Sequence, residues 1–250
     1  MLIRNVSILA SLLFSICCWA DGLDRDTLLT EAPATPKAGT VRITGGGGGA
    51  TQSDNPGTAS GVVNAAILWA PINHLAADIG AYFQDGSVGP SARVRYQFLN
   101  QADHGVDMAA GARFKLVGFS SRAEDLTPKH EAELLLAAGH KFGRLDTIVN
   151  AVVGTELGDP GKDAELKAYV GYNLSDSLRC GVDGRIQAEF VDEHGTKRPT
   201  AADTAFAVGP AASWMVTPKI QVQALVGAAK ARGAGTKTGL GGQLAGSFDF

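Results

Sequence analysis

Apolar and polar residues alternate one by one through most of this chain, in segments of roughly ten residues that begin near residue 40. In the stretch 178–190, for example, Leu178 and Val182 fall on one face, while Arg179 and Asp183 fall on the other. A period of two is the period of a β-strand, because successive side chains of a strand point to opposite faces of the sheet. No helical period explains these segments, so the pattern predicts an all-β fold.

Twelve such segments can be placed, with a count of ten as the alternative because the first contains five consecutive glycines and few side chains to judge by. The tight connections PINH, RLD, SDS and TPK follow even-numbered segments, and most longer connections follow odd-numbered ones. In an antiparallel meander this alternation places the short turns at one end. Pro210 cannot donate a ladder hydrogen bond, which predicts a bulge in the tenth strand. The predicted strands are 39–46, 60–70, 74–84, 91–99, 106–119, 131–143, 147–158, 164–174, 178–190, 205–216, 220–230 and 238–250.

Aromatic residues mark the predicted short-turn end. Each even-numbered segment finishes there with an aromatic side chain on its apolar face, and amphipathic rings prefer the membrane–water interface. Because hydrocarbon cannot hydrogen-bond an open sheet edge, a sheet in a membrane must close on itself. We therefore predict a closed antiparallel up-and-down transmembrane β-barrel, with its apolar face toward lipid. The aromatic residues are Trp69, Phe98, Phe142, Tyr172, Trp214, Phe248 and Phe250.

On these features the chain resembles the bacterial outer-membrane β-barrel proteins, a porin-like class, although it carries no fingerprint of a particular subfamily. The resemblance rests on the alternating strands, the unequal turns, and Phe250 preceded by the outward Phe248. It implies a location in the outer membrane, contact with its lipid, and recognition of residues 241–250 by the barrel-assembly machinery. The oligomeric state is left open.

The chain divides into three parts. Residues 1–20 combine a positive start, a short apolar run and small residues before the cut, which predicts a secretory signal peptide. A lipidated cysteine at Cys17 or Cys18 is the alternative. Residues 21–38 are rich in Pro, Ala and Thr and are expected to form a flexible leader, and residues 39–250 form the barrel.

By the same alternation, many charged residues face the lumen. A basic arc on the fourth and fifth strands is expected to adjoin an acidic arc on the sixth to eighth, near the external mouth. These arcs form either a pore constriction with a transverse field or a salt-bridged plug, and a barrel of twelve strands lies between filled and open sizes. The predicted lumen residues are Arg93, Arg95, Arg113, Lys115, Glu131, Glu133, Glu156, Glu165, Lys167, Asp183 and Arg185.

We therefore expect a narrow diffusion channel for small polar or charged solutes, with a sealed structural or loop-binding barrel as the alternative. The formal net charge of −3 does not suggest a nucleic-acid partner. An outer-membrane enzyme is the third class, but no serine–histidine–acid set is expected at a rim, and the paired Glu131 and Glu133 are more simply lumen charges. We expect no catalytic residue, metal or cofactor. If the barrel conducts, Arg95→Glu should shift its ion selectivity toward cations.

Overall fold

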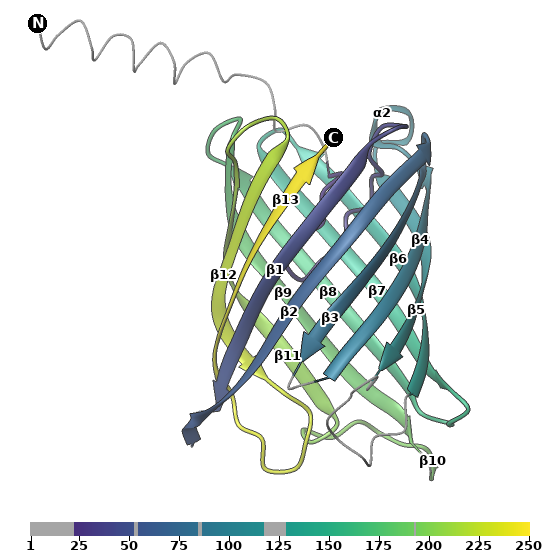
Figure 1. Cartoon of the computed structure of the whole chain (residues 1–250), viewed down its shortest axis with the longest axis vertical. Helices are drawn as coiled ribbons and strands as arrows, with labels where there is room; N and C mark the ends of the chain where they lie inside the picture. Colours follow the sequence, from purple (N-terminus) through teal and green to yellow (C-terminus); the bar gives the residue numbers. More distant parts are fainter. Residues whose placement is uncertain (1–22, 53–54, 85–86, 118–128, 193) are drawn as a thin grey trace, which may run out of the picture.

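The computed structural model describes residues 23–52, 55–84, 87–117, 129–192 and 194–250, so the expected signal peptide lies outside the described residues. Twelve long strands run antiparallel to their neighbours in one sheet (Figure 1). They are β1 Val41–Gln52, β2 Asn55–Ile72, β3 Leu75–Gln84, β4 Ser87–Leu99, β5 Asp107–Val117, β6 Lys129–Phe142, β7 Leu145–Leu157, β8 Lys162–Asn173, β9 Leu178–Asp192, β11 Thr204–Met215, β12 Ile220–Lys230 and β13 Gly239–Asp249.

The sheet closes into a barrel because its first and last strands pair. β1 and β13 are in register from Arg42↔Asp249 to Ala50↔Gly241, and β1 also pairs with β2. The remaining strands pair with their neighbours in sequence order, β9 with both β8 and β11. A short strand, β10 (Gly195–Thr196), pairs only with β9. The predicted closed meander of twelve strands is confirmed, with β10 as an addition.

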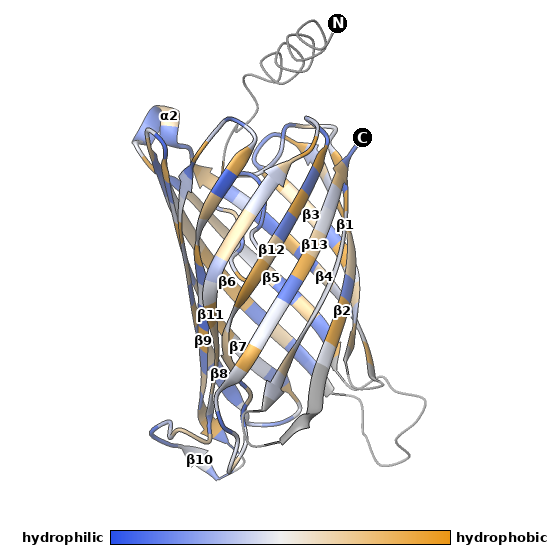
Figure 2. Cartoon of the chain, turned by 90° about the vertical axis from the view of Figure 1, so that its left-hand side faces the viewer, coloured by the Kyte–Doolittle hydropathy of each residue, from blue (hydrophilic) through white to orange (hydrophobic). Residues whose placement is uncertain are grey.

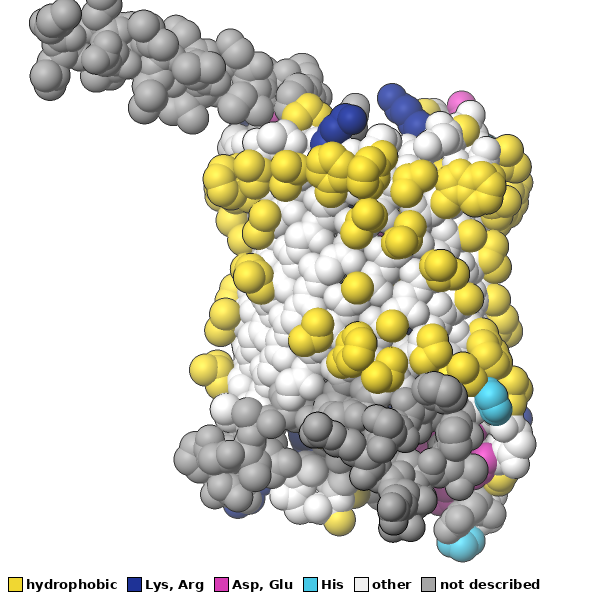
Figure 3. Space-filling model, viewed as in Figure 1, with side chains coloured by type: hydrophobic (Ala, Val, Ile, Leu, Met, Phe, Trp, Pro, Cys, Tyr) yellow, Lys and Arg dark blue, Asp and Glu magenta, His cyan; other side chains and the backbone are white. Residues whose placement is uncertain are grey.

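The two faces of each strand differ in the way the sequence predicts. In β8, Leu166 and Val170 are exposed on the outside, whereas Glu165, Lys167 and Tyr169 are buried on the inside. Orange and blue residues accordingly alternate along the strands in Figure 2. On the face shown in Figure 3, charged side chains lie toward the two ends, and the middle carries apolar or uncharged groups. The surface in contact with the surroundings is therefore the apolar one.

All seven aromatic residues named from the sequence are exposed on the outside of the barrel. Hydrophobic side chains form a row around the end that holds the short turns, at the top of Figure 3. The rings of Phe248 and Phe250 meet edge to face, with centroids 4.7 Å apart. Aromatic rings at one rim of an apolar exterior are the arrangement expected at a membrane–water interface.

The turns at this end are short and make particular backbone demands. The two-residue turn between β2 and β3 places His74 at φ 69°, and Gly143 in the turn after β6 has φ 61°. Positive φ at such positions matches the twist of the two strands that the turn joins. The longer β4–β5 connection contains the one-turn helix α2 (Gln101–His104), capped by Asn100. No helix among the described residues is long and apolar enough to cross a membrane.

The bounds of several strands and the form of the tenth strand differ from the sequence prediction. The first strand extends to Gln52 instead of ending at residue 46, because its glycine run pairs with β2 and β13 on either side. The bulge predicted at Pro210 is absent: Pro210 pairs with Val182, and the register with β12 is unchanged on either side of it. A glycine at position 209 lets β11 approach β12 closely, since an added Cβ there would lie 2.1 Å from the Val226 carbonyl oxygen.

Candidate functional site

The lumen is occupied by residues 23–38, which we call the luminal segment. This segment precedes β1 and lies within the ring of strands, as the dark purple trace in Figure 1. Leu23 is 2% exposed and Ala32 fully buried. The composition of residues 21–38 predicted a flexible leader, whereas residues 23–38 lie against the inside of the barrel wall. The reason is that the carboxylates, hydroxyls and backbone groups of the segment find partners on the wall.

Asp26 binds two arginines of β4. Its Oδ2 lies 2.7 Å from Arg93 Nη2, and its Oδ1 lies 2.9 Å from Arg95 Nη1. Arg93 also pairs with Asp78 of β3 at 2.6 Å. Arg95, by contrast, is 2% exposed and has no other carboxylate partner among the described residues. Asp26 thus provides the counter-ion of a buried arginine.

Glu31 binds two further cations, one on β5 and one on β8. Lys167 Nζ of β8 lies 2.9 Å from both carboxylate oxygens, and Arg113 Nη2 of β5 lies 3.0 Å from Oε1. The side chain of Asn150 holds the Glu31 backbone from both directions: it accepts from the amide at 2.7 Å and donates to the carbonyl at 2.9 Å. The orientation of this carboxylate is consequently fixed from three strands.

Asp183 of β9 is the third anchor, and here the wall supplies the acceptor. The fully buried carboxylate accepts hydrogen bonds from Thr27 Oγ1 at 2.7 Å, from the Leu29 amide at 2.9 Å and from Thr30 Oγ1 at 2.6 Å. Hydrogen bonds to a charged group are stronger than neutral ones, with about 1.5–3 kcal/mol for each. Asp183 therefore secures the turn of the segment.

At the short-turn rim the segment meets the seam between the first and last strands. Arg25 of the segment pairs with Asp249 of β13 at 2.6 Å, and Arg42 of β1 pairs with the same carboxylate at 2.7 Å. Arg42 also reaches Asp24 at 3.2 Å. The segment enters the barrel at the same rim at which β1 begins.

The remaining sequence-predicted lumen residues lie farther from this rim. Lys115 of β5 pairs with Glu131 at 3.2 Å and more closely with Glu133 of β6. Arg113 reaches Glu133 at 3.2 Å, so the structure brings the basic and acidic arcs into contact. Glu156 is half-buried on β7, close to the connection that leads to β8.

Glu165 lies between two cations, and Arg95 lies nearer the short turns than predicted. On β8, Glu165 pairs with Lys167 at 3.2 Å and with Arg185 of β9 at 3.3 Å. Arg95 lies in the half of β4 near the short turns and not in the outer half expected, because β4 begins at Ser87, earlier than its predicted start.

Ion pairs link many charged residues of the lumen wall into two networks. In the first, Arg93 pairs with the wall carboxylate Asp78, and Arg95 is linked to Arg93 only through Asp26 of the segment. In the second, four wall cations face three wall carboxylates; these are Arg113, Lys115, Lys167 and Arg185 against Glu131, Glu133 and Glu165. Within these ion pairs, the wall side of each network has one more cation than carboxylates, and the luminal segment supplies one carboxylate to each network: Asp26 to the first and Glu31 to the second.

Sequence reasoning missed the residues of the segment, because it has no alternation and its composition is that of a linker. The local signal was the stretch DRDTLLTEAP, residues 24–33, where acidic residues and threonines surround a pair of leucines. Such a stretch has more hydrogen-bonding and apolar groups than a linker needs. It gave no indication of which wall residues it would contact.

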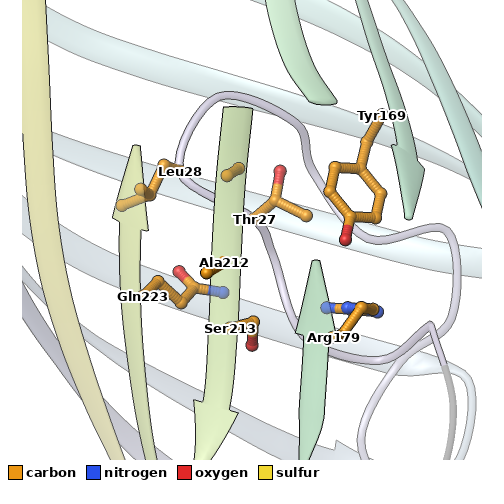
Figure 4. A pocket seen from close by; sticks show the side chains of 8 residues that line it. Thr27, Leu28, Tyr169, Arg179, Ala212, Ser213 and Gln223 are labelled. Atoms are coloured by element: carbon orange, nitrogen blue, oxygen red, sulfur yellow. The ribbon is translucent and has the colours of Figure 1, made fainter. Parts of the chain in front are cut away.

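A small space remains between the segment and the wall, on the side of β8, β9, β11 and β12 (Figure 4). It is partly open, has a volume of about 10 Å³, and is lined by Thr27 and Leu28 of the segment and by Tyr169, Arg179 and Gln223 of the wall, among others. The Arg179 guanidinium lies 5.2 Å from the centre of the Tyr169 ring. This space is too small for more than a few water molecules or a very small solute.

At the opposite end, a separate group of charges orders the β9–β11 connection. Lys197 Nζ lies 2.9 Å from both Glu189 and Asp203, and 3.2 Å from Asp192. Hydrogen bonds from Thr200 and Lys197 hold the pKa of Asp203 below its ordinary value. Within the described ranges no group of three or more His, Cys, Asp or Glu side chains could hold a metal ion.

A closed antiparallel meander with an apolar exterior and a charged interior defines the class of outer-membrane β-barrels. Solved structures of such barrels have the same fold. The NanC porin matches with a TM-score of 0.57 and 12% identity, over 84% of this chain and 100% of that one. The KdgM porin, in a complex with disordered oligogalacturonate, matches with 0.58 and 8% over 84% and 99%. The COG4313 outer membrane channel from Pseudomonas putida F1 matches with 0.57 and 14% over 87% and 97%.

No protein-family model and no curated protein matches the chain. At these identities the likeness shows the fold alone.

Proposed function

We propose that the protein lies in the bacterial outer membrane and acts as a narrow diffusion channel for small polar or charged solutes. The observation that carries this proposal is that the twelve strands enclose enough space to hold a polypeptide segment. The wall side chains alone do not fill the barrel, as they do in the smallest barrels. The segment is held to the wall by hydrogen bonds and ion pairs, and without it a polar passage would cross the apolar belt.

A sealed barrel is the second candidate, and the same segment favours it. Asp26 and Glu31 balance the charge of the wall, and most of their contacts are buried. The two candidates make opposite predictions for the wild-type protein, which retains the segment. A barrel that the segment seals is silent until the segment is removed, whereas a channel conducts with the segment in place.

The discriminating experiment compares the wild-type protein with a deletion of residues 23–36 in planar lipid bilayers. We expect small or rare current steps from the wild type, and larger, reproducible steps from the deletion variant. Heat-modifiable mobility on gels, which reports a folded barrel, serves as the folding control. Silence of the folded wild type at high protein load, with current steps only from the deletion variant, would support the sealed barrel.

Arg95→Glu, introduced into the deletion variant, tests the role of the charged wall. Reversing a buried charge in the conducting passage should shift the reversal potential toward cation selectivity. Asp176→Asn, in an exposed turn between β8 and β9, is the control. An unchanged reversal potential in the Arg95→Glu variant would remove Arg95 from the narrow part of the passage.

We also propose that residues 241–250 are read by the barrel-assembly machinery. In support, Phe248 and Phe250 project outward from the strand that closes the barrel. Phe248→Ser should lower the amount of folded protein in the outer-membrane fraction. Leu240→Ser removes an equally outward apolar side chain from the same strand and should lower it less. Equal losses would indicate a general need for apolar surface.

The comparison structures are named as porins and channels, which favours transport over catalysis only indirectly. We propose no catalytic residue and no cofactor.

A further inference from the structure

Three of the cations that contact the luminal segment also have a carboxylate partner on the wall. Arg93 is oriented by Asp78, Arg113 by Glu133, and Lys167 by Glu165. These wall partners satisfy only part of each cation. The wall therefore helps to position these three groups without the segment, and they form a prearranged set that faces inward from β4, β5 and β8.

Arg95 shows most clearly that this set has binding capacity to spare. Its side chain is 2% exposed, and Asp26 contacts it only through Nη1. Within the described part of the chain, its Nε and Nη2 atoms have no hydrogen-bond partner. A guanidinium presents a planar fork that matches both oxygens of a carboxylate. The contact with Asp26 uses one arm of that fork and leaves the rest unused.

We propose that Arg93, Arg95, Arg113 and Lys167 form the solute-binding site of the channel, that the site selects small anions with two carboxylates, and that Asp26 and Glu31 occupy it in the resting protein as internal competitors. This inference rests on the proposed channel function and names its class of solute. Each of the two networks has one uncompensated wall cation, so a solute with two carboxylates can replace the two residues without leaving a buried charge unpaired.

A solute with one negative charge would satisfy one network and leave the other with an excess cation. A neutral solute would leave both uncompensated, and a cation would be repelled. The competition also explains why the segment that fills this barrel carries Asp26 and Glu31. The segment then acts as a plug that a solute with two carboxylates displaces.

The test compares binding of glutarate, a five-carbon diacid, to three folded proteins in detergent micelles by isothermal titration calorimetry. The test variant is Asp26→Asn with Glu31→Gln, which removes the competing charges and keeps the segment. The matched control is Asp103→Asn with Asp176→Asn, which removes the same charge from exposed positions in α2 and in the β8–β9 turn, at the short-turn end. Glutaramide, the neutral diamide of the same length, is the control probe.

We expect the test variant to bind glutarate at least about tenfold more tightly than the wild type, because a single charged hydrogen bond contributes a factor of that order. The charge-matched control should behave as the wild type does, and glutaramide should not distinguish the three proteins. Adding Arg95→Gln to the test variant should abolish the gain. Equal glutarate affinity in the test variant and the wild type, or an equal gain for glutaramide, would overturn the site.

Bilayer recordings on the same proteins separate this inference from the proposed function. Current steps in the test variant that glutarate reduces, and glutaramide does not, support both. Current steps without any effect of glutarate leave the channel in place and reject the site. Binding of glutarate by a folded protein that never conducts keeps the site and rejects the channel.

Discussion

Replacing Asp183 by Asn should loosen the luminal segment without disturbing the barrel wall. The carboxylate accepts three hydrogen bonds from the segment, including one from the Leu29 backbone amide at 2.9 Å. An amide of the same shape keeps one acceptor oxygen, loses the negative charge and turns its other end into a donor. At least one hydrogen bond to a charged group is then lost, which costs about 1.5–3 kcal/mol.

Hydrogen exchange measures this cost directly, because the segment amides exchange when the segment opens. Each 1.36 kcal/mol corresponds to about a tenfold change, so the amides of Leu29, Glu31 and Ala32 should exchange roughly ten- to 150-fold faster. Asp146→Asn is the matched control: this carboxylate is also buried, but it bonds to Asn173 and Arg179 of the wall. It should leave the segment amides unchanged. Unaltered exchange of the segment in Asp183→Asn would refute the idea that Asp183 anchors it.

Two further predictions concern the wall. Leu166→Arg places a charge on the outward face near the middle of β8 and should destabilise the folded protein by about 2–4 kcal/mol in urea titrations in lipid. Asp176→Arg, in an exposed turn, should have little effect. Equal effects of the two substitutions would mean that the outward belt does not contact lipid. Gly209→Ala adds a Cβ 2.1 Å from a backbone oxygen and should cost about 1–3 kcal/mol in the same titration, whereas Gly45→Ala, whose nearest neighbour is 3.9 Å away, should be tolerated. Equal stability of the two alanine variants would show that β11 and β12 can separate freely.

The wall could be predicted from the sequence because a membrane barrel repeats one simple rule. Every strand must turn apolar groups to lipid and polar groups inward, so residues such as Leu166 and Lys167 reveal their directions by position alone. The bulge expected at Pro210 was wrong because the rule used there considered only the missing donor. The close approach of Gly209 to β12, which preserves the register, depends on the neighbouring strand.

The contents of the lumen could not be predicted in the same way. Asp26 and Glu31 lie far in sequence from Arg95 and Lys167, and no period connects them. Their pairing depends on where the segment turns, which Asp183 and Asn150 determine through individual hydrogen bonds. Sequence reasoning could name the wall charges and leave open whether they were paired. It had no means of seeing that part of the pairing comes from residues before the first strand.

The covalent connection between the luminal segment and β1 sets a threshold for any competitor. A ligand tethered to its own site by a short flexible linker has an effective concentration in the millimolar range. Residues 32–40 separate Glu31 from the first residue of β1, Val41. A free diacid would have to approach a comparable concentration, or bind more tightly than the tethered acids do, before it occupied the lumen. The barrel would then stay shut to scarce solutes and open as their supply rises.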